Sequence, residues 1–432
     1  MLRQCLPSSV RRTLNELPES LDETHERILK EIKKPNRAHA QRVLQCLVVA
    51  IRPLRVEELA EVLAVDFDDA EGIPRLKPDW LWEEQELALL SACSSLIAIV
   101  EAGGSRVVQF SHFSVKEFLT SSRLTTASGG VSNYLIGLGP AHTILAQACL
   151  GVLLQTQYDA EGHILEDHPL ARYAAEHWAT HAQFGEVSSR LQKGMEFLFD
   201  PDKPHFKVWL TLYDIDTRPN DDATFYWFAA HGDKSPAVPF YYAALCGFHD
   251  FVQLLITKHP QDVNANGGYY VRPVVAALAG KHFQTADLLL HNCADPHVQG
   301  RFGRTPLHAA ADSGNLEVVR KLIEYNPADI NARNAFGTTP LHWTSDGRHF
   351  KDGSVLRLLL ENGADIDAQD HDGRTPLHWA SDVGALEVVR VLLEHGADDV
   401  EVKGNDGMTA LQEAAERRHD AVVELIRERG AS

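Results

Sequence analysis

The second half of the chain repeats one short motif at a nearly constant interval, and this repeat constrains the fold more than any other feature. The full form of the motif is Thr-Pro-Leu-His. Three complete copies begin at Thr305, Thr339 and Thr375. Three weaker copies begin at Val238, Arg272 and Thr409. In chain order, the second residues of the six copies are separated by 34, 33, 34, 36 and 34 positions. Such a period indicates a solenoid, in which no unit can bury its apolar face alone and the stack itself forms the core.

The residues within each copy predict its local structure. Thr is a good helix N-cap, and Pro at the first helical position loses no hydrogen bond, because that N–H has no helical acceptor. Gly314 and Gly384 are expected to end the first helix in a left-handed conformation. Lys281 and Arg418 occupy the same position in weaker copies. A second helix with an apolar stripe then follows, as in 318–323.

The motif and its period resemble the ankyrin repeat. Ankyrin arrays are recognition surfaces rather than catalysts, so the resemblance implies a protein that binds another macromolecule. The His of each Thr-Pro-Leu-His is expected to form hydrogen bonds within and between repeats, not to bind a metal or act as a base. Trp343 and Trp379, which follow this His directly, are expected to pack between repeats.

Upstream of the repeats, three further segments can be distinguished. Residues 1–37 form a helical linker, residues 38–125 a winged-helix domain, and residues 126–234 a helical connector region. Six ankyrin repeats fill residues 235–432. The winged helix is indicated by three helical patterns followed by a two-stranded hairpin that turns at 102–105. We therefore predict a mostly α protein, in which a winged-helix and helical region is followed by an ankyrin-repeat solenoid.

Three stretches carry a closer resemblance. Leu17–Leu29, Arg52–Leu59 and Phe110–Leu119 are similar to fungal NACHT–ankyrin proteins, from about Leu6 onward. The corresponding domain there is often called the winged helix of GPI inositol-deacylase type, which is a label of homology and not of activity. Family members are signal-transducing NTPases of the STAND class, implicated in non-self recognition and programmed cell death. They combine a nucleotide-binding NACHT core, a winged helix and a ligand-sensing repeat array.

The chain departs from that plan because no Gly-x-x-x-x-Gly-Lys-Ser/Thr occurs anywhere in it. Nothing is therefore expected to hold the β- and γ-phosphates of a nucleotide. The chain begins just after the place where a NACHT core would end. We expect either a truncated gene product or a fragment of a longer one.

The resemblance also points to His112. In related STAND proteins, the His of a Phe-x-His-x-Ser/Thr-x-x-Glu-Phe motif touches the phosphate of bound ADP and holds the resting state closed. Residues 110–118 match this motif at every defined position. The resemblance thus implies a nucleotide-sensing role for His112 if a NACHT core is present. The alternative is that His112 only packs at the end of the wing.

Charge and cysteine usage exclude several other classes of function. The net charge of −19 argues against nucleic acid or an anionic membrane as a partner. The third helix of the winged helix offers Glu83, Glu84 and Glu86 and no Lys or Arg, so DNA binding is not expected. No apolar run is long enough to cross a bilayer. Six cysteines without paired spacing indicate reduced, mostly buried thiols in a cytoplasmic protein.

No catalytic or metal site is expected. His177 and His181 lie four residues apart and could place two imidazoles on one helix face for a metal. No third ligand is evident, so a structural pair is the favoured interpretation. Because Gly-x-Ser-x-Gly, His-Glu-x-x-His and Cys-x-x-Cys are all absent, we predict neither an enzyme nor a cofactor.

Partner contacts are expected at hairpin tips and at the concave ends of the first helices, where side chains are not needed for stacking. Phe302 and Phe336 could be binding hot spots, although each could equally pack on the neighbouring hairpin. The candidate partner-binding residues are Arg301, Phe302, Arg304, Asp312, Phe336, Asp346, His371, Asp372, Arg374, Asp382, Asn405, Asp406 and Met408.

The sequence thus favours a protein–protein recognition module of a STAND-type signalling or non-self-recognition protein. A protein or peptide would bind to the ankyrin array, and a NACHT core could associate in cis or in trans. One alternative is the regulatory half of a nucleotide-dependent NACHT NTPase switch. Another is a substrate-recruiting adaptor.

Overall fold

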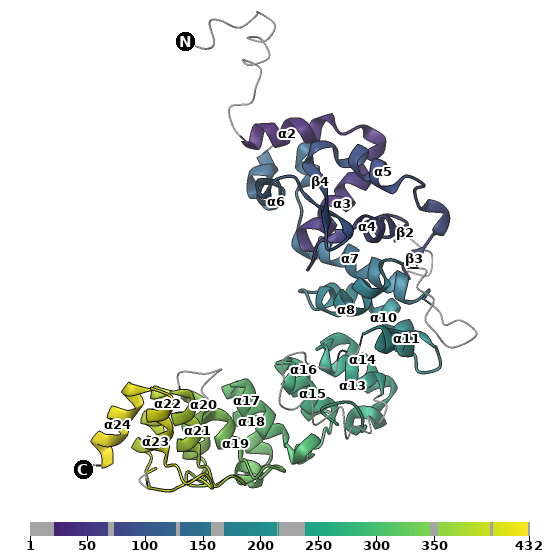
Figure 1. Ribbon diagram of the computed structural model, residues 1–432. Helices are drawn as coiled ribbons and strands as arrows, with labels where there is room; N and C mark the ends of the chain where they lie inside the picture. Colours follow the sequence, from purple (N-terminus) through teal and green to yellow (C-terminus); the bar gives the residue numbers. More distant parts are fainter. Residues whose placement is uncertain are drawn as a thin grey trace, which may run out of the picture. The chain divides into compact units, whose positions relative to one another are not determined.

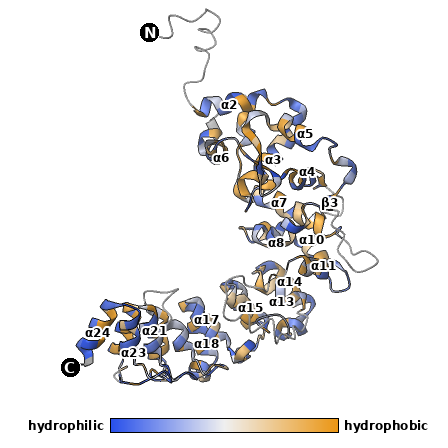
Figure 2. Cartoon of the chain, in the orientation of Figure 1, coloured by the Kyte–Doolittle hydropathy of each residue, from blue (hydrophilic) through white to orange (hydrophobic). Residues whose placement is uncertain are grey.

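The computed structural model of the 432-residue chain describes residues 21–67, 73–126, 130–156, 168–213, 215, 238–345, 353–397 and 401–430. The chain divides into two compact units, Met1–Ile215 and Asp216–Ser432, whose elements are labelled in Figure 1. Helices of both units carry hydrophobic as well as hydrophilic residues (Figure 2). Within the described segments, no helix has both the length and the apolar character that crossing a membrane requires.

The first unit begins with the expected winged helix. The helices that precede its wing are α2 (Leu21–Glu31), α3 (Arg37–Val49), α4 (Val56–Leu63) and α5 (Gln85–Cys93). The wing is an antiparallel hairpin of β4 (Ile97–Ala102) and β5 (Ser105–Phe110), and β1 (Leu54–Arg55) pairs with β5 to complete the sheet. A short pair, β2 (Val65–Asp66) and β3 (Arg75–Leu76), lies between α4 and α5 in the sequence.

The wing turns through two glycines that the sequence supplies for this purpose. Gly103 and Gly104 have φ values of 58° and 78°, which favour a tight hairpin turn whose twist matches that of the strands. Helix α6 (Phe113–Thr120) follows β5 almost directly. The predicted order of three helices and a two-stranded wing is therefore confirmed by α3, α4, α5 and the β4–β5 hairpin, whereas α6 was not predicted.

The remaining helices of the first unit pack around α7 (Leu138–Leu153), which itself packs against the winged helix. They are α8 (Ala171–Ala182), α9 (Val187–Arg190), α10 (Gln192–Leu198) and α11 (His205–Leu212). Helix α7 contacts α3 and α4 on the winged-helix side and α8 on the other. Trp178 and Trp209 form the aromatic centre between α8 and α11, with ring centroids 5.3 Å apart. Both indoles are fully buried.

Two buried glutamates of α4 explain the Arg52–Leu59 stretch. The Glu58 carboxylate has no exposed surface and accepts two hydrogen bonds of 2.8 Å from the Arg52 guanidinium. The backbone N–H and Nε of Arg55 also donate to it. Glu61, one turn later, accepts from the backbone N–H of Leu170. This cluster closes the start of α4 and ties the winged helix to the segment before α8.

The second unit is a stack of helix pairs. The inner helices, which contact one another in sequence order, are α13 (Pro239–Leu245), α15 (Pro273–Ala279), α17 (Pro306–Ser313), α19 (Pro340–Ser345), α21 (Pro376–Val383) and α23 (Ala410–Glu416). The outer helices are α14 (His249–Lys258), α16 (Phe283–His291), α18 (Leu316–Tyr325), α20 (Ser354–Glu361), α22 (Leu386–Glu394) and α24 (Asp420–Gly430). Each inner helix begins at the second residue of a copy, as predicted, and the array is an ankyrin solenoid.

The repeated Thr and His form a clasp that joins consecutive repeats. His308 Nδ1 accepts the backbone N–H of Thr305 at 3.2 Å, so the proton of the neutral ring resides on Nε2. That Nε2 donates to the carbonyl oxygen of Thr338, in the hairpin of the next repeat, at 3.0 Å. His342 and His378 repeat this arrangement with the carbonyls of the next hairpins. The predicted structural role of these histidines is confirmed.

The residue eight positions after the first residue of an inner helix is left-handed in several repeats, whatever its identity. Gly314 and Gly384 have φ values of 71° and 73°. Lys281 and Arg418, in the same position, have φ values of 62°, although a side chain disfavours this conformation. Repeat geometry therefore overrides local preference at two of these positions.

The cysteines follow expectation in the described part of the chain. Four thiols are buried, at Cys46, Cys93, Cys149 and Cys246, and Cys293 is exposed. All five are free thiols. Burial raises the pKa of the Cys46 thiol to about 12, so this group is an unreactive core residue.

Candidate partner-binding surface

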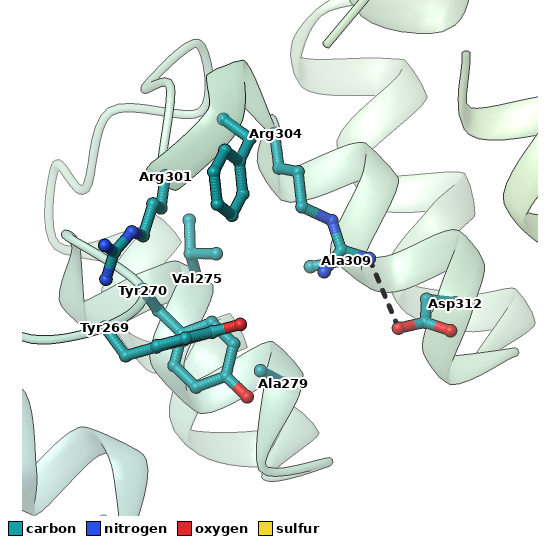
Figure 3. Close-up of a pocket in the computed structure, with 9 residues that line it drawn as sticks. Tyr269, Tyr270, Val275, Ala279, Arg301, Arg304, Ala309 and Asp312 are labelled. Atoms are coloured by element: carbon teal, nitrogen blue, oxygen red, sulfur yellow. Dashed lines mark hydrogen bonds and ion pairs between the residues drawn. The ribbon is translucent and has the colours of Figure 1, made fainter. Parts of the chain in front are cut away.

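A pocket opens on the second unit where hairpin tips meet the inner helices α15 and α17 (Figure 3). Its floor consists of small or apolar residues of these helices, namely Val275, Ala279 and Ala309. Its polar and aromatic lining consists of Tyr269, Tyr270, Arg301, Phe302, Arg304 and Asp312. The last four of these six are among the residues proposed from the sequence.

An irregular hairpin before α15 places the two tyrosines. The backbone N–H of Gly267 donates to the carbonyl oxygen of Val271 at 3.0 Å, which closes the hairpin. Val271 has a φ of 69°, a conformation that is rare for a β-branched residue. The backbone N–H of Tyr270 donates to the Tyr241 hydroxyl at 3.0 Å. These contacts anchor the backbone that carries Tyr269 and Tyr270 at the edge of the pocket.

Arg304 is held tightly but not completely satisfied. Its guanidinium carbon lies 3.7 Å from the centroid of the Trp343 ring, and its Nη2 lies 3.4 Å from an Asp312 oxygen. Its buried Nε has no hydrogen-bond acceptor among the described residues. Burial lowers the pKa of Arg304 below its ordinary value, and the Asp312 charge only partly opposes this effect.

Aromatic residues continue from the pocket to the next hairpin. Arg301 places its guanidinium carbon 5.5 Å from the Tyr269 ring centroid and 5.7 Å from that of Phe302. The Phe302 and Phe336 rings are 5.2 Å apart and tilted by 45°. Phe336 nevertheless leaves 50% of its surface exposed. The two phenylalanines thus pack on each other across neighbouring hairpins, and Phe336 also presents a large apolar face to solvent.

The tryptophans pack between repeats, as expected. The Trp343 and Trp379 rings are 6.1 Å apart. Trp343 Nε1 donates to the Thr338 hydroxyl at 3.1 Å, and Trp379 Nε1 donates to an Asp370 oxygen at 2.9 Å. These bonds fix both indoles, and with them the ring on which Arg304 lies.

Two of the arginines do not lie clear of the stacking contacts, and that expectation was wrong. Arg304 is only 23% exposed and packs on Trp343 of the next repeat. Arg374 is similarly enclosed, with its Nε 3.1 Å from a Glu413 oxygen in the following repeat. The reason is that a long side chain at this position reaches the next inner helix. Both arginines therefore contribute to the stack as well as to the surface.

The other proposed residues lie at or beside the hairpin tips. Asp382 joins Arg374 and Arg417 by ion pairs of 3.5 Å and 2.9 Å. The tip residues are linked from one hairpin to the next, because Asn405 N–H donates to the Asp372 carbonyl at 2.7 Å. Asp346 lies outside the described residues. The remaining tip residues are His371, Asp406 and Met408, of which only Met408 is partly buried.

Tyr269 and Tyr270 were not predicted from the sequence, although a signal for Tyr269 was present. Tyr269, Phe302 and Phe336 each lie four residues before the Pro that starts an inner helix. Aligning the weaker copy with the complete ones would have placed Tyr269 in the same line of aromatic residues. Tyr270 has no such counterpart, because it depends on the irregular hairpin.

His112 caps a helix in the first unit. It is the N-cap of α6, where its Nδ1 accepts the backbone N–H of Ser114 at 3.2 Å. Its ring lies 4.3 Å from that of Phe113, and both side chains are exposed. The Ser114 hydroxyl also contacts Nε2 of buried His25 at 2.9 Å. His112 thus caps a helix directly after the wing. This position is compatible with both a nucleotide-sensing role and simple packing at the end of the wing.

His177 and His181 both lie beside the Tyr173 ring, but His181 is fully buried and its hydrogen bonds go to residues other than His177. Both ring nitrogens of His181 are engaged, one with His142 Nδ1 at 2.8 Å and the other with the Tyr173 hydroxyl at 2.9 Å. Burial lowers the pKa of His181 to about 3. The described residues contain no group of three side chains that could hold a metal ion. His142 precedes His181 by 39 residues and lies on another helix. The spacing of residues within α8 therefore cannot reveal this contact.

Comparison with known proteins agrees with both parts of this architecture. Residues 274–370 and 347–432 match the family described as ankyrin repeats (3 copies), and residues 26–129 match the family described as the GPI inositol-deacylase winged helix domain. The chain is 33% identical over 300 residues to the azaphilone pigments biosynthesis cluster protein L of Monascus ruber. That alignment covers 65% of this chain and 61% of the length of the relative.

Proposed function

We propose that this chain is a recognition module that binds a partner protein or peptide through the hairpin and inner-helix face of its ankyrin array. Ankyrin repeats generally bind proteins, and this array presents a line of aromatic side chains on that face. The observation that carries the proposal is the pocket between α15 and α17, where Arg301 and Arg304 lie among aromatic rings. Aromatic and arginine side chains dominate the energetics of protein interfaces.

We propose further that the chain acts without catalysis, in the cytoplasm, as part of a STAND-type signalling system. In such a system, the winged helix would face a NACHT core supplied in cis or in trans. The exposed ring of His112, at the N-cap of α6, supports this placement. The nucleotide-dependent switch is the corresponding alternative, and it requires that core.

A second candidate function is a substrate-recruiting adaptor. The Monascus relative is named for a pigment biosynthesis cluster, and this favours the adaptor. Both functions use the same array surface, so they differ in the partner and not in the mode of binding.

The shared proposal can be tested by quantitative affinity capture with the full chain. Phe336→Ala removes an exposed aromatic ring from the proposed face. Glu317→Ala, on outer helix α18 with a side chain 72% exposed, is the matched control. We expect a partner whose recovery falls at least tenfold, on the order of 1.4 kcal/mol, with the first variant and not with the second. Equal recovery of every captured protein by both variants would contradict the proposed surface.

A further inference from the structure

We propose that the pocket between α15 and α17 binds a carboxylate of the partner protein, and that Arg304 is the residue that pairs with it. This inference rests on the proposed function and deepens it by naming the chemistry of the ligand.

Arg304 has a hydrogen-bond donor without an acceptor among the described residues. Asp312 contacts only Nη2, at 3.4 Å, which is long for a charge-assisted hydrogen bond. Nε is shielded from solvent and has no acceptor within the described residues. A guanidinium presents its donors in a fixed fork that matches a carboxylate. A carboxylate that displaces the side chains now covering Nε would supply the acceptor that the described residues do not provide.

Arg304 is also preorganised for binding. The Trp343 ring, at 3.7 Å from the guanidinium carbon, holds the guanidinium in one plane. Trp343 is itself held by its hydrogen bond to Thr338. Little side-chain freedom is therefore lost when a ligand pairs with Arg304, which favours binding.

The local charge also favours a carboxylate. The chain carries a net charge of −19, yet Arg301 and Arg304 line this pocket against the single carboxylate of Asp312. Figure 3 shows Tyr269 and Tyr270 across the pocket from Arg304. Their rings form a wall against which apolar atoms beside the carboxylate can pack. A cation would meet two arginines here, so a basic ligand does not fit.

The carboxylate could belong to an Asp or Glu side chain or to a chain terminus, and the test separates these sources. The immobilised full chain would select binders from two libraries of random twelve-residue peptides, one displayed with a free C-terminus and one with a blocked C-terminus. Synthetic copies of the binders would then be measured by fluorescence polarisation. We expect each binder to lose at least tenfold in affinity when its essential Glu is changed to Gln, or when its C-terminus is amidated. The same changes should have little effect on binding to the Arg304→Gln chain.

Two further variants keep the test decisive. Asp312→Asn removes the competing carboxylate and should tighten binding at least threefold, which tests the proposal even if Arg304→Gln does not fold. Arg390→Gln, on outer helix α22 with a side chain 46% exposed, should leave affinity unchanged.

The outcomes distinguish the two levels of inference. Binders that need no carboxylate, or that bind Arg304→Gln as well as the unchanged chain, overturn the carboxylate site. If Phe336→Ala still weakens the binding of those peptides, the proposed function stands without the carboxylate site. Failure of both libraries to yield any binder sensitive to Phe336→Ala or Arg304→Gln would count against both proposals.

Discussion

Nδ1 of His142 lies 2.8 Å from Nδ1 of His181 in the core of the first unit. One ring must donate and the other accept, so the contact cannot survive protonation of both nitrogens. The second nitrogen of His181 faces the Tyr173 hydroxyl, so a protonated His181 keeps both contacts only if His142 presents an unprotonated Nδ1 and the hydroxyl accepts. The pair therefore links the packing of α7 against α8 to the protonation state of two histidines.

Acidification should destabilise both units. Burial lowers the pKa of His181 to about 3 and that of His308 to about 4, whereas an unfolded His has a pKa of about 6.5. The unfolded chain thus binds more protons below pH 6.5, and stability is lost as the pH falls from there toward the folded pKa values. Urea denaturation at pH 7.5 and pH 5 should show a loss of about 2 kcal/mol for each of these residues.

The control variant is His371→Gln, at an exposed hairpin tip. This change should leave the pH dependence of the free energy of unfolding unaltered. His181→Gln should reduce the dependence in the first unit. Equal free energies of unfolding at the two pH values would contradict the prediction.

Removing the Glu58 carboxylate should strongly destabilise the first unit. Burial by itself would raise the pKa of Glu58, but hydrogen bonds from Arg52 and Arg55 outweigh it and hold the pKa below its ordinary value. Glu58→Ala leaves these donors without their acceptor and should cost about 3–5 kcal/mol. The neighbouring Glu57, which is exposed, provides the control Glu57→Ala. Similar urea midpoints for both variants would show that the cluster contributes nothing specific.

Truncating a core leucine should weaken several repeats at once. Leu377 is 4% exposed in α21, and Leu377→Ala should cost about 2–5 kcal/mol. Because each repeat is stabilised by its neighbours, protection from hydrogen exchange should also fall in α19 and α23. Arg427→Ala, on the exposed side of α24, should be nearly silent. Loss of protection confined to α21 would refute coupling between repeats.

Glycine should stabilise the chain where the repeat imposes a left-handed residue with a side chain. Lys281→Gly and Arg418→Gly should each raise the free energy of unfolding by about 1 kcal/mol, because non-glycine residues in this region are strained. Gly384→Ala should have the opposite sign, since its Cβ would lie 2.5 Å from the His419 ring. Thermal denaturation of the three variants tests the sign of each change in stability. A higher stability of Gly384→Ala would contradict the prediction.

The chain should not bind ADP with useful affinity. One imidazole that contacts one phosphate contributes about 1.5–3 kcal/mol, whereas even millimolar binding needs about 4 kcal/mol. Calorimetry with ADP should therefore detect no micromolar binding, and observing it would reveal a nucleotide site. His112→Ala should still cost about 1 kcal/mol of stability, because it removes the N-cap of α6.

Local signals allowed much of the fold to be predicted from the sequence. One of the three predicted helical patterns of the winged helix forms α4 (Val56–Leu63), and inner helices begin at the predicted Pro, because capping residues lie beside the backbone groups that they satisfy. The role of His308 could be predicted for a related reason, since its contacts recur with the repeat. Contacts that recur in every repeat can therefore be predicted from the repeated sequence.

The candidate site was only partly predictable, because its contacts join residues that are distant in the sequence. The enclosure of Arg304 depends on Trp343, and that of Arg374 on Glu413 in the following repeat. A single repeat examined alone shows both arginines as surface residues. The irregular hairpin that positions Tyr270 likewise depends on the Tyr241 hydroxyl, which no local pattern indicates.

The clasp between repeats limits the order in which the hydrogen bonds of the array can form during synthesis. His308, His342 and His378 each bind a carbonyl that is 30 to 32 residues downstream. A repeat emerging from the ribosome therefore holds an imidazole N–H that gains its acceptor only when the following hairpin has been translated. The last copy differs, because Gln412 occupies the His position and accepts the N–H of Thr409 within the same turn. Each of the three imidazoles thus gains its acceptor only after the following hairpin exists, whereas Gln412 needs no later residue for its hydrogen bond.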